Sequence, residues 1–144
     1  MGMMTRAEIE SLFERRRRAW DAHDAAAMAA THSIDGVVKS PMFGDLYGRE
    51  EIEASYARAF HMFPDWAMVD EPLLVDGNTV VEVFSSTATH SADFMGLPAT
   101  GRHFRIEGVR IHVVKDGLVH EERRLYDFTS LLIQVGVLKG KPAV

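Results

Sequence analysis

Two β-rich segments near the C-terminus, 102–114 and 118–126, carry ionisable residues at even-numbered positions. Side chains two residues apart in a strand point to the same face, so the even positions of each segment share a face. The groups are Arg110, His112, His120, Glu122 and Arg124. Cations, imidazoles and a carboxylate on one face could bind an oxygen anion and move a proton.

The turn between the two segments decides which of these side chains are neighbours. Lys115-Asp116 followed by Gly117 favours a type I turn with a left-handed glycine bulge. That turn pairs even positions with even positions. The predicted pairs are His112 with His120 and Arg110 with Glu122, with Arg124 one diagonal step away.

Charge assigns roles within the predicted cluster. Glu122, between Arg110 and Arg124, should have a lowered pKa, because two cations stabilise its carboxylate. Such a carboxylate orients arginines rather than abstracting a proton. The arginines could then hold a ligand carboxylate or stabilise a developing enolate.

The candidates for proton transfer near neutral pH are His112, His120 and His90. His90 ends a largely apolar row of even positions in the preceding segment, 79–91, which is the pattern expected of a pocket wall. Two interpretations stay open. If the shared face meets solvent, the cluster is an ordinary polar surface. If it faces the helices, it lines a site.

Apolar side chains elsewhere could enclose a fused-ring or terpenoid-sized ligand. Loop 92–101 is a candidate lid over such a pocket. The alternative for each apolar residue is a place in the ordinary core. The candidate substrate-binding residues are Trp20, Met42, Tyr56, Phe60, Phe94 and Leu97, together with His120.

Composition and missing motifs exclude several classes of function. The 144-residue chain has no cysteine, which removes disulfides and thiolate chemistry and favours a reducing cytoplasm. A net charge of −5 disfavours nucleic acid, and no apolar run could span a membrane. We expect no metal, since there is no His-Glu-x-x-His pair and two arginines would repel a dication. Phosphate-loop, dinucleotide and serine-esterase motifs are also missing, so we expect no cofactor.

Hydrophobic periodicity places the elements that must position these groups. Thr5 and Glu8 form a capping-box spacing that starts a first helix, on whose apolar stripe Arg16 could point inward. Residues 42–48 read as a loop. The predicted helices are 6–22, 25–31, 49–60 and 129–135, and the predicted strands are 34–39, 66–75, 79–91, 102–114 and 118–126.

Helices followed by a long antiparallel meander predict one α+β domain over residues 1–144, with the helices packed on one face of a strongly curved sheet. Such a sheet leaves a cone-shaped space between sheet and helices. On the outer face, Val109, Ile111 and Val113 predict contact with a second subunit and hence a homodimer.

The order of elements and several motifs resemble the SnoaL-like polyketide cyclase family of the nuclear-transport-factor-2-like superfamily. The more specific part is Gly96 to Arg102, followed by Tyr126 to Phe128 with Leu131, Gln134 and Gly136. The remaining motifs are Trp20 to Asp24, Gly48 to Ile52, Phe63 to Trp66 and Asp116-Gly117. The resemblance implies a cone-shaped α+β barrel, a cytosolic homo-oligomer and a cofactor-free, aldol-type ring closure of polyketide esters.

The resemblance can be carried over residue by residue. The family's acid/base aspartate on the last strand falls on Arg124, and an associated pocket histidine falls on Arg110. Ketosteroid isomerases of the superfamily have a catalytic carboxylate where this chain has Ser40, and a tyrosine aligned with Arg16. Positions similar to the family that suggest scaffold are His90, Phe104, Glu107, Asp127 and Gln134.

Limonene epoxide hydrolases of the superfamily use an arginine between two carboxylates. Arg105 with Glu107 is similar to part of that set, but the last-strand acid falls on Leu125.

Together these observations predict a protein that binds a small, largely apolar carbonyl or carboxylate compound in a cone pocket. It would act on this compound as a cofactor-independent cyclase or isomerase-type enzyme. The catalytic candidates are His112, His90, Glu122, Arg110 and Arg124. The alternative is a non-catalytic ligand-binding or dimerisation module with the same fold.

Overall fold

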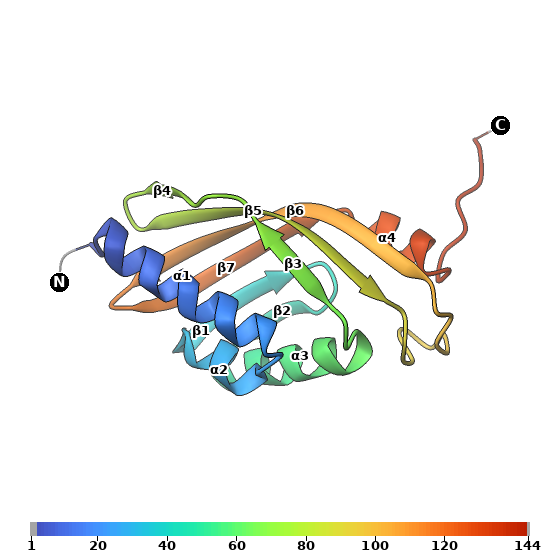
Figure 1. The fold of residues 1–144 in the computed structure, drawn as a ribbon, viewed down its shortest axis with the longest axis horizontal. Helices are drawn as coiled ribbons and strands as arrows, with labels where there is room; N and C mark the ends of the chain where they lie inside the picture. The colour runs from blue at the N-terminus through green and yellow to red at the C-terminus, as the bar shows by residue number, and fades with distance from the viewer. Residues whose placement is uncertain (1–2, 144) are drawn as a thin grey trace.

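A computed structural model describes residues 3–143 as a curved sheet with helices α1, α2 and α3 on one side and α4 near one end (Figure 1). The helices are α1 (Arg6–Asp21), α2 (Ala25–Ala30), α3 (Arg49–Met62) and α4 (Phe128–Gln134). The strands are β1 (His32–Ser40), β2 (Gly44–Tyr47), β3 (Ala67–Asp70), β4 (Leu74–Asp76), β5 (Thr79–Thr89), β6 (His103–Lys115) and β7 (Leu118–Tyr126).

Side-chain caps set where the helices begin. Thr5 accepts from the Glu8 amide while Glu8 accepts from the Thr5 amide, so the predicted capping box is present. Asp24 and Asp127 cap α2 and α4 in the same way, each accepting an amide hydrogen three residues on. The first two caps fix the N-terminal ends of α1 and α2, two of the helices that cover the concave face of the sheet.

The sheet is mixed rather than purely antiparallel, and it is not closed. Its strand order is β2-β1-β7-β6-β5-β3, with β4 also paired to β5, and β1 runs parallel to β7. The predicted loop 42–48 contains strand β2, and the predicted strand 66–75 is interrupted between β3 and β4, where Pro72 removes a donor. The parallel pairing of β1 with β7 brings the start of the chain beside its last strand.

The predicted register of the β6–β7 hairpin is wrong by two residues. Asp116 and Gly117 both have positive φ, +53° and +78°, which makes a two-residue type I′ turn instead of a type I turn with a glycine bulge. A bulge at His120 then adds one residue to β7. The observed pairs are Arg110 with Arg124 and His112 with Glu122.

Even positions still face even positions, and this face is buried. Side chains of β5 and β6 alternate between a buried even row and a partly exposed odd row. The even face therefore points to the helices, which settles the interpretation that the sequence left open. On the odd face Val109, Ile111 and Val113 are partly exposed, and their cover by a second copy stays a prediction. No helix within residues 3–143 is long and apolar enough to cross a membrane.

Gly108 lets β6 and β7 come together under the site. A Cβ at this position would lie 2.4 Å from the Leu125 carbonyl oxygen, 2.8 Å from Cβ of Tyr126 and 3.1 Å from Cζ of Phe84. Two of these atoms belong to the chain just across the strand pair, where the structure has little room to relax.

We therefore expect Gly108→Ala to lower the free energy of unfolding by about 1–3 kcal/mol or more through overpacking. Gly140→Ala is the matched control, because its nearest neighbour would be a flexible Ile133 carbon at 3.8 Å. Urea unfolding of both variants measures the difference. Equal stability of the two would show that the strand pair relaxes freely at Gly108.

Candidate functional site

A pocket lies between the helices and the concave face of the sheet, and its empty space of about 450 Å³ includes solvent at its opening. We call it the aromatic cavity. Its apolar wall is formed by Trp20, Phe43, Trp66, Met68, Phe84 and Ile106. The polar side chains in its lining are Ser55 and Tyr56 of α3, Arg110 of β6, and Arg124 and Tyr126 of β7. An aromatic chamber with a few convergent polar groups is the usual form of a small-molecule site.

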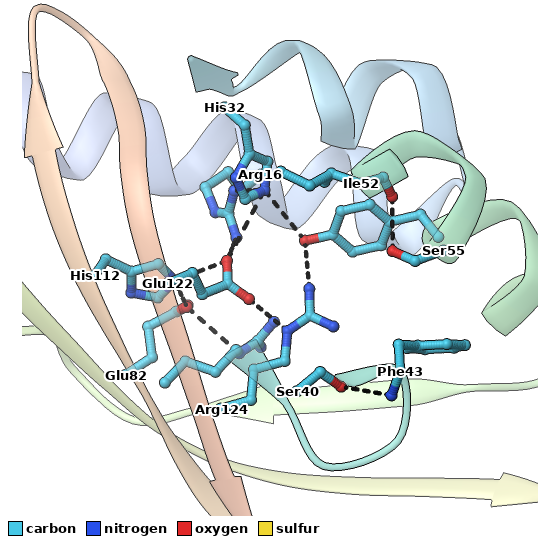
Figure 2. A network of polar contacts seen from close by, with 12 residues as sticks. Arg16, His32, Ser40, Phe43, Ile52, Ser55, Glu82, His112, Glu122 and Arg124 are labelled. Atoms are coloured by element: carbon cyan, nitrogen blue, oxygen red, sulfur yellow. Dashed lines mark hydrogen bonds and ion pairs between the residues drawn. The ribbon is translucent and has the colours of Figure 1, made fainter. Parts of the chain in front are cut away.

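Glu122 is the centre of a polar network behind this cavity, shown in Figure 2. Its side chain is fully buried, with Oε1 2.7 Å from Nη2 of Arg16 and Oε2 2.5 Å from Nε of Arg124. Burial alone would raise the pKa of Glu122, but the guanidiniums of Arg124 and Arg16 outweigh it and hold this pKa well below its usual range. The carboxylate thus stays ionised and joins α1 to β7.

Tyr56 connects the network to the cavity. Nη2 of Arg124 donates to its hydroxyl oxygen at 3.2 Å, and the same hydroxyl lies 3.4 Å from Nε2 of His32. Nη1 of Arg16 approaches that nitrogen at 3.1 Å from the other side. Burial and the nearby charge of Arg16 hold the pKa of His32 well below its usual range, so the ring is neutral.

Glu82 extends the network along β5 and β6. Its Oε1 lies 3.4 Å from Nε2 of His112 and 3.6 Å from Nε of Arg110. The same nitrogen of His112 lies 3.3 Å from Oε1 of Glu122, so one imidazole stands between two carboxylates. Arg110 also lies 3.6 Å from Asp70, a carboxyl whose pKa is raised by burial and by Glu82.

Arg110 forms part of two cavities. Its guanidinium carbon lies 4.9 Å from the Phe84 ring centre and 5.9 Å from Trp20, within cation–π range. A second cavity, whose empty space of about 310 Å³ includes solvent at its opening, shares Arg110, Trp20 and Met68 with the first. Asp70 and Glu82 also line it. A ligand could therefore contact Asp70 and Glu82 from the second cavity but not from the aromatic one.

The structure brings together only some of the predicted site residues. Trp20, Tyr56, Arg110 and Arg124 line the aromatic cavity, and Glu122 and His112 are buried behind it. Those that do not line it are Met42, Phe60, Phe94, Leu97, His90 and His120.

Two of these histidines lie in other surroundings. His90 is buried under loop 92–101, with Nδ1 2.8 Å from the Thr100 hydroxyl and its ring against Phe94. His120 is partly exposed at the bulge, 3.1 Å from the Lys115 carbonyl oxygen.

Sequence reasoning missed His32 and Glu82. Glu82 occupies the same even-numbered row as Phe84 and Ser86, so its charge in an otherwise apolar row was the available signal. His32 precedes the predicted strand 34–39, and only the parallel pairing of β1 with β7 places it at Glu122. Arg16 does point inward as the helical stripe indicated, with 4% of its surface exposed. In residues 3–143 no cluster of His, Asp and Glu side chains could hold a metal ion.

The model of the family SnoaL, the SnoaL-like polyketide cyclases, matches residues 10–135. The chain belongs to this family. The match covers the whole site, from Arg16 on α1 to Arg124 on β7, and it confirms the resemblance seen in the sequence. No curated protein sequence matches this SnoaL-like chain significantly.

Solved structures share the fold of this SnoaL-like protein. TsrD from Streptomyces laurentii is 23% identical with a TM-score of 0.81, covering 94% of this chain and 99% of TsrD. AclR from Streptomyces galilaeus is 24% identical with a TM-score of 0.81, covering 96% and 91%. IdmH from Streptomyces antibioticus, a candidate polyketide cyclase, is 24% identical with a TM-score of 0.74, covering 88% and 97%. These likenesses confirm the cone-shaped α+β fold.

We expect Glu122→Gln to lower the free energy of unfolding by about 3–5 kcal/mol at pH 7, because two buried guanidiniums lose their carboxylate. The loss should depend on pH. The pKa of Glu122 is lower in the folded chain than its ordinary 4.5, so its stabilisation is complete above that value and declines as pH falls toward the folded pKa. Urea unfolding from pH 7 to pH 3 should thus show the two proteins converging in stability.

Glu107→Gln is the matched control, since this glutamate pairs with Arg105 on the surface and its side chain is 72% exposed. Its effect should stay within about 0.5 kcal/mol at every pH. A stability gap between wild type and Glu122→Gln that does not change below pH 4.5 would contradict the assigned charge of Glu122.

Proposed function

We propose that this SnoaL-like protein binds a small, largely apolar compound in the aromatic cavity through a carbonyl or carboxylate oxygen. The observation that carries the proposal is the placement of two guanidiniums, those of Arg110 and Arg124, in a wall whose other side chains are mostly aromatic or aliphatic. Contacts made on folding offset the desolvation cost of the buried arginines. A cavity that exposes their remaining N–H groups is suited to an oxygen acceptor.

We also propose that binding promotes cofactor-independent proton-transfer chemistry of the cyclase or isomerase type. A carbonyl oxygen beside two cations gains negative charge at lower cost, which favours loss of a proton from the neighbouring carbon. Family membership supports this reaction class, while the change of the family's acid/base position to Arg124 sets this chain apart from the antibiotic cyclases. A cytoplasmic location and a homodimer belong to the same proposal.

Ligand-dependent stabilisation tests the binding step. We expect at least one compound among polycyclic ketones, polyketide-like esters, epoxides and aromatic carboxylates to raise the unfolding temperature. A ligand present at 100 times its Kd adds about 2.7 kcal/mol of stability. Arg124→Ala should lose this shift, whereas Arg123→Ala should keep it, because Arg123 directly precedes Arg124 in β7 and is exposed on the other face.

Deuterium exchange then separates an enzyme from a binding module. For a ketone that binds, proton NMR in D₂O should show faster exchange beside the carbonyl with wild type than with Arg124→Ala. Binding without accelerated exchange would favour the non-catalytic module. A panel in which no compound shifts the unfolding temperature would remove the small-molecule proposal altogether.

A further inference from the structure

The polar groups that reach the aromatic cavity are mainly hydrogen-bond donors. Arg110 and Arg124 have no acceptor atom. Tyr126 keeps its proton, because burial raises its pKa. Among the described residues that line this cavity there is no Asp, Glu or His. A bound ligand therefore meets donors, and it meets no carboxylate or imidazole base.

Tyr56 adds a further donor. Its oxygen already accepts from Nη2 of Arg124, so the hydroxyl proton must point elsewhere. The nearest protein acceptor is Nε2 of His32 at 3.4 Å, a long contact for an O–H donor. Arg16 competes for that one lone pair at 3.1 Å. The phenol proton is thus held weakly and is available to a ligand oxygen, while the Arg124 contact polarises it.

His112 does not reach the aromatic cavity. Its Nδ1 lies 3.2 Å from the Val80 carbonyl oxygen, and its Nε2 faces Glu82 and Glu122. The ring is fully buried and is not part of the cavity lining. A ligand in the cavity therefore has no contact with this imidazole.

Positive charge rather than negative charge faces the aromatic cavity. The guanidiniums of Arg110 and Arg124 line it, whereas their carboxylate partners do not. Asp70 and Glu82 line the second cavity, and Glu122 is buried behind the first. Positive charge that faces a largely desolvated site favours an anionic ligand.

We propose that the cavity takes its ligand as an enolate or phenolate anion, with the ionised oxygen held by Tyr56, Arg110 and Arg124. The inference rests on the proposed function, because it concerns the ionisation state of the compound that binds there. The ligand is an acidic enol or phenol on a flat, apolar framework that fits between the aromatic walls. Its O–H bond breaks, the proton passes to water, and the electron pair stays on the ligand oxygen as the bound anion.

A chromogenic phenol tests this proposal directly. The probe is 4-nitrophenol, whose neutral and anionic forms have different absorption spectra, and 4-nitroanisole is the matched analogue that cannot ionise. Binding is followed by quenching of tryptophan fluorescence, since both tryptophans of the chain, Trp20 and Trp66, line the cavity. A positive charge within about 4–6 Å lowers the pKa of an acid by about 1–3. We therefore expect bound 4-nitrophenol to show the spectrum of the anion at a pH about one unit below the pKa of the free phenol.

Variants locate the effect. Tyr56→Phe keeps the ring and removes one donor, and Arg124→Ala removes a cation. Both should reduce the anionic fraction of bound phenol about tenfold or more, while Arg123→Ala should leave it unchanged. Melting curves establish that each variant is folded, and the spectrum with wild type decides the question even if a variant is not.

Bound 4-nitrophenol that keeps its neutral spectrum, or 4-nitroanisole that binds as tightly, would overturn this inference while leaving ligand binding intact. If ketones of the panel bind and 4-nitrophenol does not, the inference of an anionic ligand would be overturned and the proposed function would remain. Failure of every compound to quench fluorescence or raise the unfolding temperature would overturn the proposed function as well.

Discussion

The contact between Glu122 and its two arginines holds the site together. Glu122 is fully buried on β7, and it pairs with Arg16 from α1 and with Arg124 from its own strand. Transfer of one carboxylate and two guanidiniums out of water costs several kcal/mol per ion, so the arrangement is stable only with close, well-directed contacts. Helix α1 must therefore cross the sheet where Arg16 reaches Glu122, and this requirement places Trp20, one turn further along α1, in the cavity wall.

The same carboxylate sets the state of the groups around it. His32 and His112 both lie within 4 Å of Glu122 Oε1, yet their other neighbours differ. An arginine donor faces Nε2 of His32, and burial together with this charge keeps that ring neutral, whereas acceptor oxygens lie near both nitrogens of His112. Neither imidazole lines the aromatic cavity. The remaining donors, on Tyr56 and the two arginines, give the site its preference for an oxygen anion.

Much of the fold could be predicted from the sequence, because it depends on local signals. The capping box at Thr5, the apolar stripe of α1 and the alternation of β5 and β6 are periodic patterns that one segment shows by itself. The sequence grouped the even positions on one face and left open only whether that face meets solvent or the helices. The inward direction of Arg16 followed from its place on the apolar stripe of α1.

The contacts within the site could not be predicted, because they depend on register and on distant pairing. A type I′ turn and a bulge at His120 together moved each partner by two residues, so His112 lies opposite Glu122 rather than His120. His32 reached the network only through the parallel pairing of β1 with β7, which no local pattern indicates. Phe60 and Phe94, which the sequence suggested as pocket lining, lie in the hydrophobic core instead. Aromatic side chains pack equally well in a core and in a pocket wall, so their type does not distinguish the two.

The most direct test of this account is the ¹⁵N NMR spectrum of the histidine rings at neutral pH, with His32→Asn used to assign the His32 signals. We predict that His32 gives the spectrum of a neutral ring with hydrogen on Nδ1, because burial and Arg16 hold its pKa well below its usual range. A protonated His32 at neutral pH would contradict the account, since Arg16 would then face a cation instead of a lone pair and the network around Glu122 would not have the assigned charges.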